Sequence, residues 1–450
     1  MSQNKRARQA LAFREKDVTR LLRLAVSAES ASLIGLSGVG KSNLFHHLSD
    51  PAVQQHYNQA DDPNDYIFVK VNFHYAADYS DRSIYSLILE QFELLEDGPT
   101  ADRFEKETFT KIQTYHDTLI EAQNDLLKVQ RQFKLAVRAL LGRSERKLVL
   151  VFDQFDELYR EATQTLFSNL RGLRETYKYR LCYFLFTRGA LIGMGEMDRH
   201  RDEFYELVAA NIIGLKPYNA EDARRTIDRI CTRNKWIFDG QLFDYYSQLS
   251  GGHAGLLRAL LIASYKDAVP VLAHVDVAQN VTRLLKHENI ESECEKIWIS
   301  LALDEQELLL SGRFQTATSQ SVGLRYLLEK GVLTRPNRRN LTIFSRLLEG
   351  YIDSLRGREY VLHINEAAQR VTFNGNTITN LEQIEYCILV NLYQKRGHVV
   401  PYSDIIASLP NNHPDATYAT RTILHHVHRL NQKIYVNLIH LISNQGFRLE

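Results

Sequence analysis

A chain of 450 residues is too long to fold around one hydrophobic core, so several domains are expected. Its formal net charge of +1 excludes a globally basic nucleic-acid-binding protein, so any such surface must be local. The 4 cysteines lie far apart, no apolar run approaches the roughly 18 residues of a membrane span, and the start lacks a signal-peptide core, which together predict a soluble, cytoplasmic protein.

The first informative segment runs from Gly35 to Ser42 and fits the pattern G-x-x-x-x-G-K-[ST] at every defined position. An apolar run over 31–35 precedes it like a short buried strand, and 43–48 follows it like a helix. Glycines in such a loop let backbone N–H groups turn toward phosphate oxygens. Lys41 is expected to reach the β- and γ-phosphates, and the Ser42 hydroxyl to ligate Mg²⁺. The residues predicted to bind ATP or ADP here are Gly35, Gly38, Val39, Gly40, Lys41, Ser42 and Asn43.

The region after the P-loop is expected to supply structure rather than chemistry. The span 66–72 alternates well enough for a strand. From about 102 to 141 the chain is polar and nearly free of Pro and Gly, which predicts helices that lead to the next strand. Within it, we expect residues 115–127 to be a solvated helix face with no chemistry.

An acidic motif follows a continuous apolar run at 147–152, which is typical of a strand buried on both faces of a parallel sheet. Asp153 ends the run, and an acid at this tip of a strand lies beside the P-loop, where it is expected to hold Mg²⁺ directly or through water. Asp156 and Glu157 follow at the spacing of a group that polarises the attacking water, so both are catalytic candidates. The alternative for either acid alone is a solvated helix N-terminus, where carboxylates are favoured.

A third strand is predicted at 181–186, ending in Thr187 and Arg188. In a P-loop sheet this strand lies next to the one that carries Asp153. Arg188 would then point toward the γ-phosphate as a charge sensor, which adds it to Lys41 among the catalytic candidates. An ordinary arginine of a loop after a strand explains the residue equally well.

Together, the P-loop, the acids at 153–157 and the Thr187–Arg188 pair resemble the STAND class of signalling ATPases, which are relatives of AAA+ proteins. The resemblance covers most of residues 10–355. It implies an α/β P-loop NTPase, with a parallel sheet sandwiched by helices, followed by an α-helical lid. Arg14 would lie in the nucleotide-flanking segment of that class and contact the cofactor, and 249–256 resembles its lid motif.

The origin-recognition type of AAA+ ATPase is the alternative family, because it also couples a P-loop domain to winged helices. Its members usually carry an Asn as first sensor, where this chain has Thr187–Arg188. Arg258 could serve as their second sensor arginine, or it is a surface arginine of a lid helix. In the lid motif, Ala254 stands where the STAND class commonly has proline. STAND remains the better match.

Two winged-helix (α+β) domains are expected after the lid. Residues 288–355 combine helical periodicity, including a helix from 324 that Gly331 stops, with a short hairpin, and they resemble the winged-helix scaffold that packs behind the lid in STAND ATPases. From about 360 on, strands, a turn at Asn374–Gly375, three helix patterns and a final hairpin resemble an OmpR/PhoB-type domain. The predicted domains are a P-loop ATPase domain at 1–215, a helical lid at 216–287, a structural winged helix at 288–357 and a DNA-binding winged helix at 358–450.

The last domain carries the prediction of double-stranded DNA binding. In the resembled fold the third helix, here 420–435, enters the major groove, and the wing touches adjacent phosphates. Seven basic residues against six acidic ones after residue 360 leave a charge of +1, so the isolated domain is expected to bind DNA weakly. His425, His426 and His428 are expected on the surface or facing the DNA groove rather than around a metal ion. By the resemblance, the candidate DNA contacts are Arg421, Arg429, Gln432, Lys433 and Arg448.

These motifs leave two functional classes open. In the first, ATP binding or slow hydrolysis sets the conformation or self-association of a switch that controls DNA binding, as in transcription regulation. In the second, a signalling or defence-type switch uses the terminal winged helix to dock a protein partner or to sense a ligand, and an origin-recognition-like ATPase is a further alternative. The helix–wing pattern favours the first class, and the near-neutral charge after residue 360 favours the second. We expect the first.

Overall fold

The computed structural model of the chain describes most of its residues and divides into two compact units. One unit comprises residues 1–301 and 318–351, and the other 302–317 and 352–450. The four predicted domains divide the chain more finely and stay a prediction. The described residues are 11–57, 66–98, 100–122, 125–142, 146–192, 194, 198–272, 275–316, 321–335, 340–356, 362–366, 368–373, 376–409, 423–424, 426–427, 429–431, 433–434, 438–442 and 445–449.

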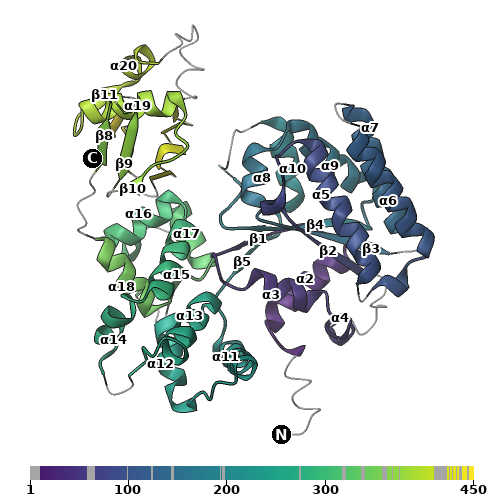
Figure 1. Cartoon of the computed structure of the whole chain (residues 1–450), viewed down its shortest axis with the longest axis horizontal. Coiled ribbons are helices and arrows are strands. Elements are labelled where there is room, and N and C mark those ends of the chain that lie inside the picture. Colours follow the sequence, from purple (N-terminus) through teal and green to yellow (C-terminus); the bar gives the residue numbers. More distant parts are fainter. Residues whose placement is uncertain are drawn as a thin grey trace. The chain divides into compact units, whose positions relative to one another are not determined.

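A five-stranded parallel sheet forms the centre of the first unit, in the order β2–β3–β4–β1–β5 (Figure 1). Because their apolar runs are covered on both faces, β1 and β4 are buried along their whole length. β4 lies between β1 and β3, so the ends of all three strands meet at the edge that carries the P-loop. The sheet and its flanking helices confirm the predicted α/β P-loop NTPase fold. The strands are β1 (Ala31–Gly35), β2 (Tyr66–Asn72), β3 (Lys147–Asp153), β4 (Leu181–Thr187) and β5 (Ile212–Leu215).

Helices cover both faces of this sheet. Figure 1 shows α2 and α3 on one side, and α8, α9 and α10 on the other. α5, α6 and α7 pack on one another beside the edge strand β2, where the rings of Tyr85 and Phe133 stack with centroids 4.2 Å apart. The helices are α2 (Glu15–Val26), α3 (Lys41–Leu48), α4 (Pro51–Tyr57), α5 (Asp81–Glu93), α6 (Lys106–Glu121), α7 (Leu126–Leu141), α8 (Phe155–Glu161), α9 (Gln164–Thr176) and α10 (Arg199–Ala209).

The segment 115–127 differs from the single solvated helix face predicted for it. α6 ends and α7 begins within it, and His116 on α6 is only 9% exposed. The two ring nitrogens of His116 each lie 2.8 Å from a partner on α5, namely Ser86 Oγ and Glu93 Oε1. Ser86 sits in the middle of α5, where backbone N–H groups are committed to the helix and cannot stabilise an oxyanion. The cluster therefore joins two helices and is not a hydrolytic site.

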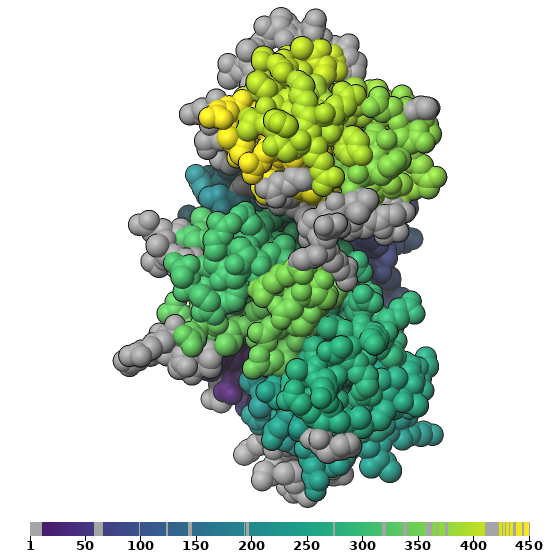
Figure 2. Space-filling view, turned by 90° about the vertical axis from the view of Figure 1, so that its left-hand side faces the viewer, coloured from purple at the N-terminus to yellow at the C-terminus, as the bar shows by residue number. Residues whose placement is uncertain are grey.

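The remainder of the first unit is largely helical, and the teal and green surfaces in Figure 2 belong mainly to this part of the chain. The helix predicted to be stopped by Gly331 ends at Glu329, and Gly331 adopts a left-handed φ of 70°, which confirms the predicted stop. The strands after it, β6 and β7, pair antiparallel. The elements are α11 (Ala220–Asn234), α12 (Phe243–Ser250), α13 (Ala254–Tyr265), α14 (Val277–Leu284), α15 (Glu288–Ile299), α17 (Val322–Glu329), β6 (Leu333–Thr334), β7 (Thr342–Ile343) and α18 (Arg346–Leu355).

The second unit contains two small antiparallel sheets, in the orders β10–β9–β8 and β11–β13–β12. α19 packs with both sheets around a core that includes Ile388, Val427 and Phe447. The described residues from 423 to 434 are helical, as predicted. The predicted turn Asn374–Gly375 lies outside the described residues. The elements are α16 (Leu303–Ser311), β8 (Leu362–Asn365), β9 (Arg370–Phe373), β10 (Asn376–Thr377), α19 (Gln383–Gln394), β11 (Val399–Pro401), α20 (Tyr402–Ala407), β12 (Ile439–Ile442) and β13 (Gly446–Leu449).

Among the helices that the structure describes, none combines the length and the apolar character that a membrane span requires.

Candidate functional site

The connection from β1 to α3 is a tight loop with Gly38 and Gly40 in left-handed conformations, at φ 72° and 102°. The φ of Gly40 would strain any L side chain, and an added Cβ would also meet the hydroxyl of Tyr218, so glycine is favoured at this position. The loop delivers Lys41 as the first residue of α3. An anion held here meets backbone N–H groups and the positive end of the helix. The predicted P-loop is therefore present as a phosphate-binding geometry.

Lys41 is folded back onto the loop. Its Nζ donates to the carbonyl oxygens of Gly35 at 2.6 Å, Leu36 at 3.1 Å and Thr187 at 3.5 Å. Burial lowers the pKa of Lys41 to about 8, although the nearby carboxylates of Asp156 and Asp153 act in the opposite direction. An incoming phosphate would replace these neutral carbonyl oxygens with anionic ones and so restore the charge that burial disfavours.

The two predicted magnesium ligands are brought together at the end of the sheet. Lys70 from β2 contacts both, because its Nζ lies 2.7 Å from Asp153 Oδ2 and 3.1 Å from Ser42 Oγ. A hydroxyl and a carboxylate oxygen are ligands that Mg²⁺ accepts, so the donor set fits the ion. The sequence reasoning missed Lys70, although a single charged residue in the apolar strand 66–72 was a visible signal.

Asp156 is 3% exposed and holds the loop after β4. Its carboxylate accepts hydrogen bonds from the backbone N–H of Arg188, at 2.9 and 3.1 Å, and from that of Gly189 at 3.4 Å. Both oxygens are thereby occupied by this loop. The geometry favours a positioning role for Asp156 over the predicted contact with an attacking water.

Glu157 is the more accessible acid, with 42% of its side chain exposed. Oε2 accepts a hydrogen bond from the Tyr79 hydroxyl at 3.1 Å, and Oε1 lies 3.5 Å from a guanidinium nitrogen of Arg188. Burial, followed by the charge of Glu157, raises the pKa of Tyr79 to about 12, so the hydroxyl stays a donor. The Arg188 guanidinium also donates to Gln154 Oε1 at 3.0 Å. The two catalytic candidates therefore lie side by side.

A cavity of about 970 Å³ opens in front of the P-loop. Residues 36–43, Asp153, Gln154 and Arg188 line one part of it. Helices α11, α13 and α15 line the rest, and they contribute four cationic side chains: Arg229, Arg233, Arg258 and Lys296. Within the described part of the chain, the three arginines form no ion pair, so their charge is available to an anion. Arg258, for which the sequence left two interpretations, thus lies at the cavity.

In the segment predicted as the lid, α13 is attached to the P-loop by its N-cap residue His253. Its Nε2 lies 2.8 Å from the carbonyl oxygen of Ser37, and its Nδ1 accepts a hydrogen bond from Leu256 N at 3.3 Å. Burial lowers the pKa of His253 to about 4, so the ring is neutral near pH 7. With Nδ1 as acceptor, the proton resides on Nε2 and is donated to the loop. Gly255 N adds a hydrogen bond to Gly38 O at 3.1 Å.

An acidic side chain also lies against the P-loop. A Cβ added at Gly38 or at Gly255 would collide with Oε1 of Glu293, from α15. The side chain is 15% exposed, and Oε2 lies 3.5 Å from Lys296 Nζ. Glycines in the loop and in the lid therefore make room for a carboxylate beside a predicted phosphate site. Neither His253 nor Glu293 carried a sequence signal that distinguished it from its neighbours.

Arg14 ties the segment before α2 to the P-loop. Its guanidinium donates to Val39 O at 2.8 Å and to Lys216 O at 3.0 Å, and lies 4.6 Å from the ring centroid of Tyr218. Tyr218 in turn accepts a hydrogen bond from Asn43 Nδ2 at 3.0 Å. These contacts bring the two nucleotide-binding candidates, Arg14 and Asn43, to the same tyrosine. Their direct contact with a nucleotide stays a prediction.

Comparison with protein families agrees with this geometry. Residues 10–184 match the family model described as the AAA ATPase domain. The chain carries an AAA ATPase domain. The matched range begins before Arg14 and includes the P-loop, the acids at 153–157 and most of β4. Curated proteins gave no significant match to the chain.

Solved structures similar to the chain are distant from it in sequence. The Walker-type ATPase of Pyrococcus abyssi is 12% identical, with 76% of this chain and 96% of that chain covered and a TM-score of 0.45. Cdc6p from Pyrobaculum aerophilum is 16% identical, with 77% and 94% covered and a TM-score of 0.35. The ORC1 protein of Aeropyrum pernix, solved in complex with DNA, is 12% identical, with 97% and 88% covered and a TM-score of 0.38.

Outside the AAA ATPase domain, two predicted DNA-binding residues form ion pairs within the second unit. Arg429 contacts Glu382 at 2.6 Å and Glu385 at 3.3 Å, while Lys433 Nζ lies 2.5 Å from Glu385 Oε2. Arg448 lies on β13 opposite His440. Arg421 and Gln432 lie outside the described residues. The DNA contacts stay predictions. Arg429 and Lys433 would have to release a carboxylate before they could contact DNA.

His426 is 7% exposed, which differs from the surface or groove-facing position predicted for it; His425 and His428 lie outside the described residues. Its Nδ1 is 3.7 Å from Glu382 and 4.0 Å from Glu385. Burial alone would raise the pKa of Glu385, but His426 and Lys433 lower it to about 2. Because cationic side chains already neutralise both carboxylates, the cluster is better explained as a structural ion-pair network than as a metal site.

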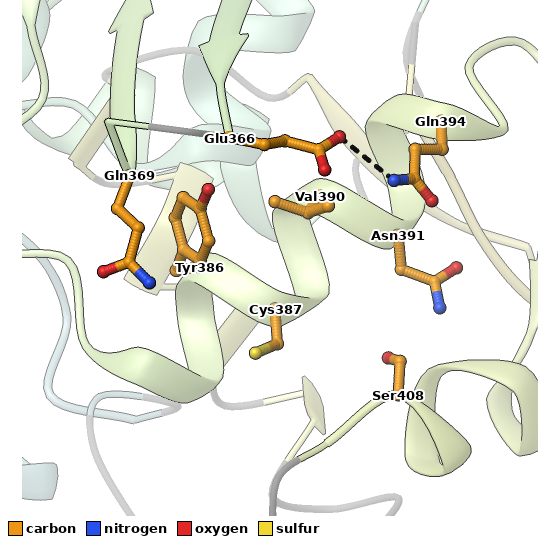
Figure 3. A pocket seen from close by; sticks show the side chains of 8 residues that line it. All are labelled: Glu366, Gln369, Tyr386, Cys387, Val390, Asn391, Gln394 and Ser408. Atoms are coloured by element: carbon orange, nitrogen blue, oxygen red, sulfur yellow. Dashed lines mark hydrogen bonds between the residues drawn. The ribbon is translucent and has the colours of Figure 1, made fainter.

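A smaller cavity of about 280 Å³ lies beside α19 in the second unit (Figure 3). Glu366 and Gln394 are joined across it by a hydrogen bond of 3.1 Å. Asn391 Nδ2 donates to Asp404 O at 3.2 Å, and the half-buried thiol of Cys387 accepts from Gln383 at 3.8 Å. Polar and apolar groups alternate along this side of the helix, as Tyr386 and Val390 show in the same view. The cavity could accept a small polar ligand or a side chain.

Proposed function

We propose that this protein is an ATP-dependent molecular switch of the STAND type, which binds ATP at the P-loop cavity, hydrolyses it slowly and thereby controls its C-terminal unit. The observation that carries the proposal is the convergence of Lys41, Asp153, Arg188 and the lid arginines around one cavity of about 970 Å³. A cavity of this size, rich in cationic groups and closed on one side by a P-loop, suits a nucleotide with several phosphates.

Nucleotide binding would use groups that already lie at the loop. Lys41 exchanges carbonyl oxygens for β- and γ-phosphate oxygens, and the backbone of 38–43 surrounds them. Ser42 and Asp153 supply oxygen ligands for Mg²⁺, which would neutralise phosphate charge when bound. Arg14 supports the loop from the nucleotide-flanking segment.

Hydrolysis would depend on the acids after β3. Glu157 is placed to polarise the attacking water, since its carboxylate is partly exposed and close to Arg188. Asp156 keeps the Arg188 backbone in position, and Arg188 responds to the charge of the γ-phosphate. The lid, joined to the loop through His253, would transmit the nucleotide state, as expected of a slow switch.

The C-terminal unit is proposed to bind double-stranded DNA as a winged-helix domain, so that the protein acts in transcription regulation. The order of β-sheet, helices and final hairpin supports this role. Self-association in the ATP state would bring several weak DNA-binding units together and raise their effective concentration.

A signalling or defence-type switch is the second candidate, and two observations favour it. Arg429 and Lys433 are neutralised by Glu382 and Glu385, which reduces the charge offered to DNA, and the cavity beside α19 could take a ligand or a partner's side chain. An origin-recognition-like ATPase differs from the first proposal in its biological use rather than in its chemistry.

The proposal is tested with the full chain in two measurements. Calorimetry would measure ATP binding by the wild type, by Lys41→Ala and by Lys178→Ala, an exposed control on the AAA ATPase domain. A random-sequence duplex pool would then be bound without nucleotide, with ADP and with a non-hydrolysable ATP analogue, with Arg448→Ala for comparison. We expect Lys41→Ala to weaken ATP binding about a hundredfold or more, because several charge-assisted hydrogen bonds are lost.

The DNA measurement separates the two candidates. Binding that requires the ATP analogue and is lost in Lys41→Ala and Arg448→Ala would support a DNA-binding switch. If no nucleotide state binds DNA, the C-terminal unit is assigned to protein or ligand recognition instead. Unaltered ATP binding by Lys41→Ala would remove the nucleotide site altogether.

A further inference from the structure

Lys70 is the one charged residue of β2, and it occupies a position between two oxygens of the P-loop site. In the parallel register with β3, Lys70 lies opposite Val151 and Asn72 lies opposite Asp153, so the lysine side chain reaches along the strand toward the carboxyl edge of the sheet. Its ammonium contacts Asp153 at 2.7 Å and Ser42 at 3.1 Å. These are the two side chains predicted to ligate Mg²⁺.

An ammonium group and a magnesium ion make different demands on this pair of oxygens. Mg²⁺ needs near-octahedral oxygen ligands at about 2.1 Å. An ammonium group has three N–H donors and contacts oxygen atoms at the longer distances of hydrogen bonds. Two of the Lys70 donors are directed to Asp153 and Ser42, which leaves the third for a phosphate oxygen. The lysine can therefore bridge protein oxygens and a nucleotide in the way a bound cation does.

The surroundings of Lys70 keep its ammonium group between Ser42 and Asp153. Its side chain is 20% exposed and that of Asp153 is 9% exposed, so the ion pair is largely shielded from solvent and from salt. A divalent cation entering between Ser42 and Asp153 must either share the space with a like charge or displace the ammonium from its carboxylate. Either event opposes binding of the ion.

We propose that Lys70 serves as a built-in cation for the nucleotide phosphates and makes ATP binding by this chain largely independent of Mg²⁺. The inference rests on the proposed function that the P-loop binds ATP. It concerns affinity, not hydrolysis. Removing the lysine would end its competition with Mg²⁺ for Ser42 and Asp153, and would leave the Asp153 carboxylate facing the phosphates when no divalent ion is present.

The test compares ATP dissociation constants of the full chain in excess Mg²⁺ and in EDTA, by calorimetry. For the wild type, we expect the ratio of the constant in EDTA to that in Mg²⁺ to stay below about tenfold. For Lys70→Met, which keeps the aliphatic stem, this ratio should exceed that of the wild type by about tenfold. Lys70→Arg keeps a cation and should resemble the wild type, and Lys178→Met controls for loss of an exposed lysine.

Each result decides the proposal. A ratio of about tenfold or more for the wild type overturns it without any variant, so the test survives a Lys70→Met protein that does not fold. An equal or smaller ratio in folded Lys70→Met also overturns it, and circular dichroism establishes that the variant is folded. Lys41→Ala separates the two levels: ATP binding that this variant retains in full refutes the nucleotide site itself, whereas loss in Lys41→Ala with an unchanged ratio in Lys70→Met refutes only the role of Lys70.

Discussion

The sequence predicts phosphate contacts both at the P-loop cavity and on the helix at 423–434, yet the two regions use their cations in opposite ways. Three lid arginines line the cavity, and none of them forms an ion pair within the described residues. On the C-terminal helix, Arg429 and Lys433 are bound by Glu385 of α19 and by Glu382, the residue that caps its N-terminus. An anion entering the cavity meets available charge, whereas DNA at the helix must first compete with a carboxylate.

For binding an anion, it matters more whether a cation is free of a carboxylate partner than whether a cation is present. The Glu385 side chain has no exposed surface, so releasing its partners would leave a buried charge without compensation. The lid arginines carry no such cost, because exposed side chains exchange water for phosphate oxygens. Four predictions test this contrast and the groups on which it depends.

The largest effect is expected at the partly exposed acid beside Arg188. Glu157→Gln should lower ATP turnover about a hundredfold, because a positioned general base of this kind contributes at least that much. ATP affinity should change less than about twofold, since the amide preserves the shape of the side chain. Phosphate release and calorimetry on the same protein check both values, with Glu161→Gln on the same helix as control. Turnover equal to that of the wild type would exclude Glu157 from the chemistry.

The ion-pair network of the C-terminal unit should matter for stability. Glu385→Ala leaves Arg429 and Lys433 without their buried partner and should lower the free energy of unfolding by about 2 kcal/mol. This loss is smaller than that for a fully buried pair because both cations are partly exposed. Denaturant unfolding of the full chain measures the loss, with the exposed Glu366→Ala as control. A cost below about 0.5 kcal/mol would show that these cations are effectively free.

The protonation of Lys41 should make ATP binding depend on pH. Burial lowers its pKa to about 8, so the charged form dominates below that pH and is lost as pH rises through it. The dissociation constant for ATP should therefore rise about tenfold from pH 7 to pH 9. Glu385, with its pKa lowered to about 2, stays charged throughout that range.

Lys41→Arg provides the control for this pH dependence, because a guanidinium stays charged at pH 9. Its affinity, whatever the absolute value, should be flat between pH 7 and pH 9. The same slope in both proteins would assign the titration to another group.

The smallest effect is expected at the acid beside the P-loop. Glu293→Gln removes a negative charge that lies against Gly38 and should raise ATP affinity about threefold, since Lys296 and solvent already screen part of the repulsion. Calorimetry at fixed salt measures the change, and Glu291→Gln, exposed on the same helix, controls for net charge. An affinity that falls instead would give Glu293 a supporting role at the site.

Much of the nucleotide site could be predicted because its features are local. The P-loop needs glycines and Lys41 at a fixed spacing, and an uninterrupted apolar run predicts the buried strand that ends in Asp153. The strands β1 to β4 and the helix after the P-loop lie where periodicity predicts them. The same reasoning placed the final hairpin and the helices before it.

The fold class and the core of the nucleotide site could be read from the amino-acid sequence, because local backbone geometry and side-chain period depend on neighbouring residues. Packing in three dimensions was needed to show which distant side chains meet there: Lys70 at Asp153, His253 at Ser37, Glu293 at Gly38. It also decided that Lys433 faces Glu385. Such contacts join residues far apart in the chain, and their direction depends on how the elements pack, which no local pattern encodes.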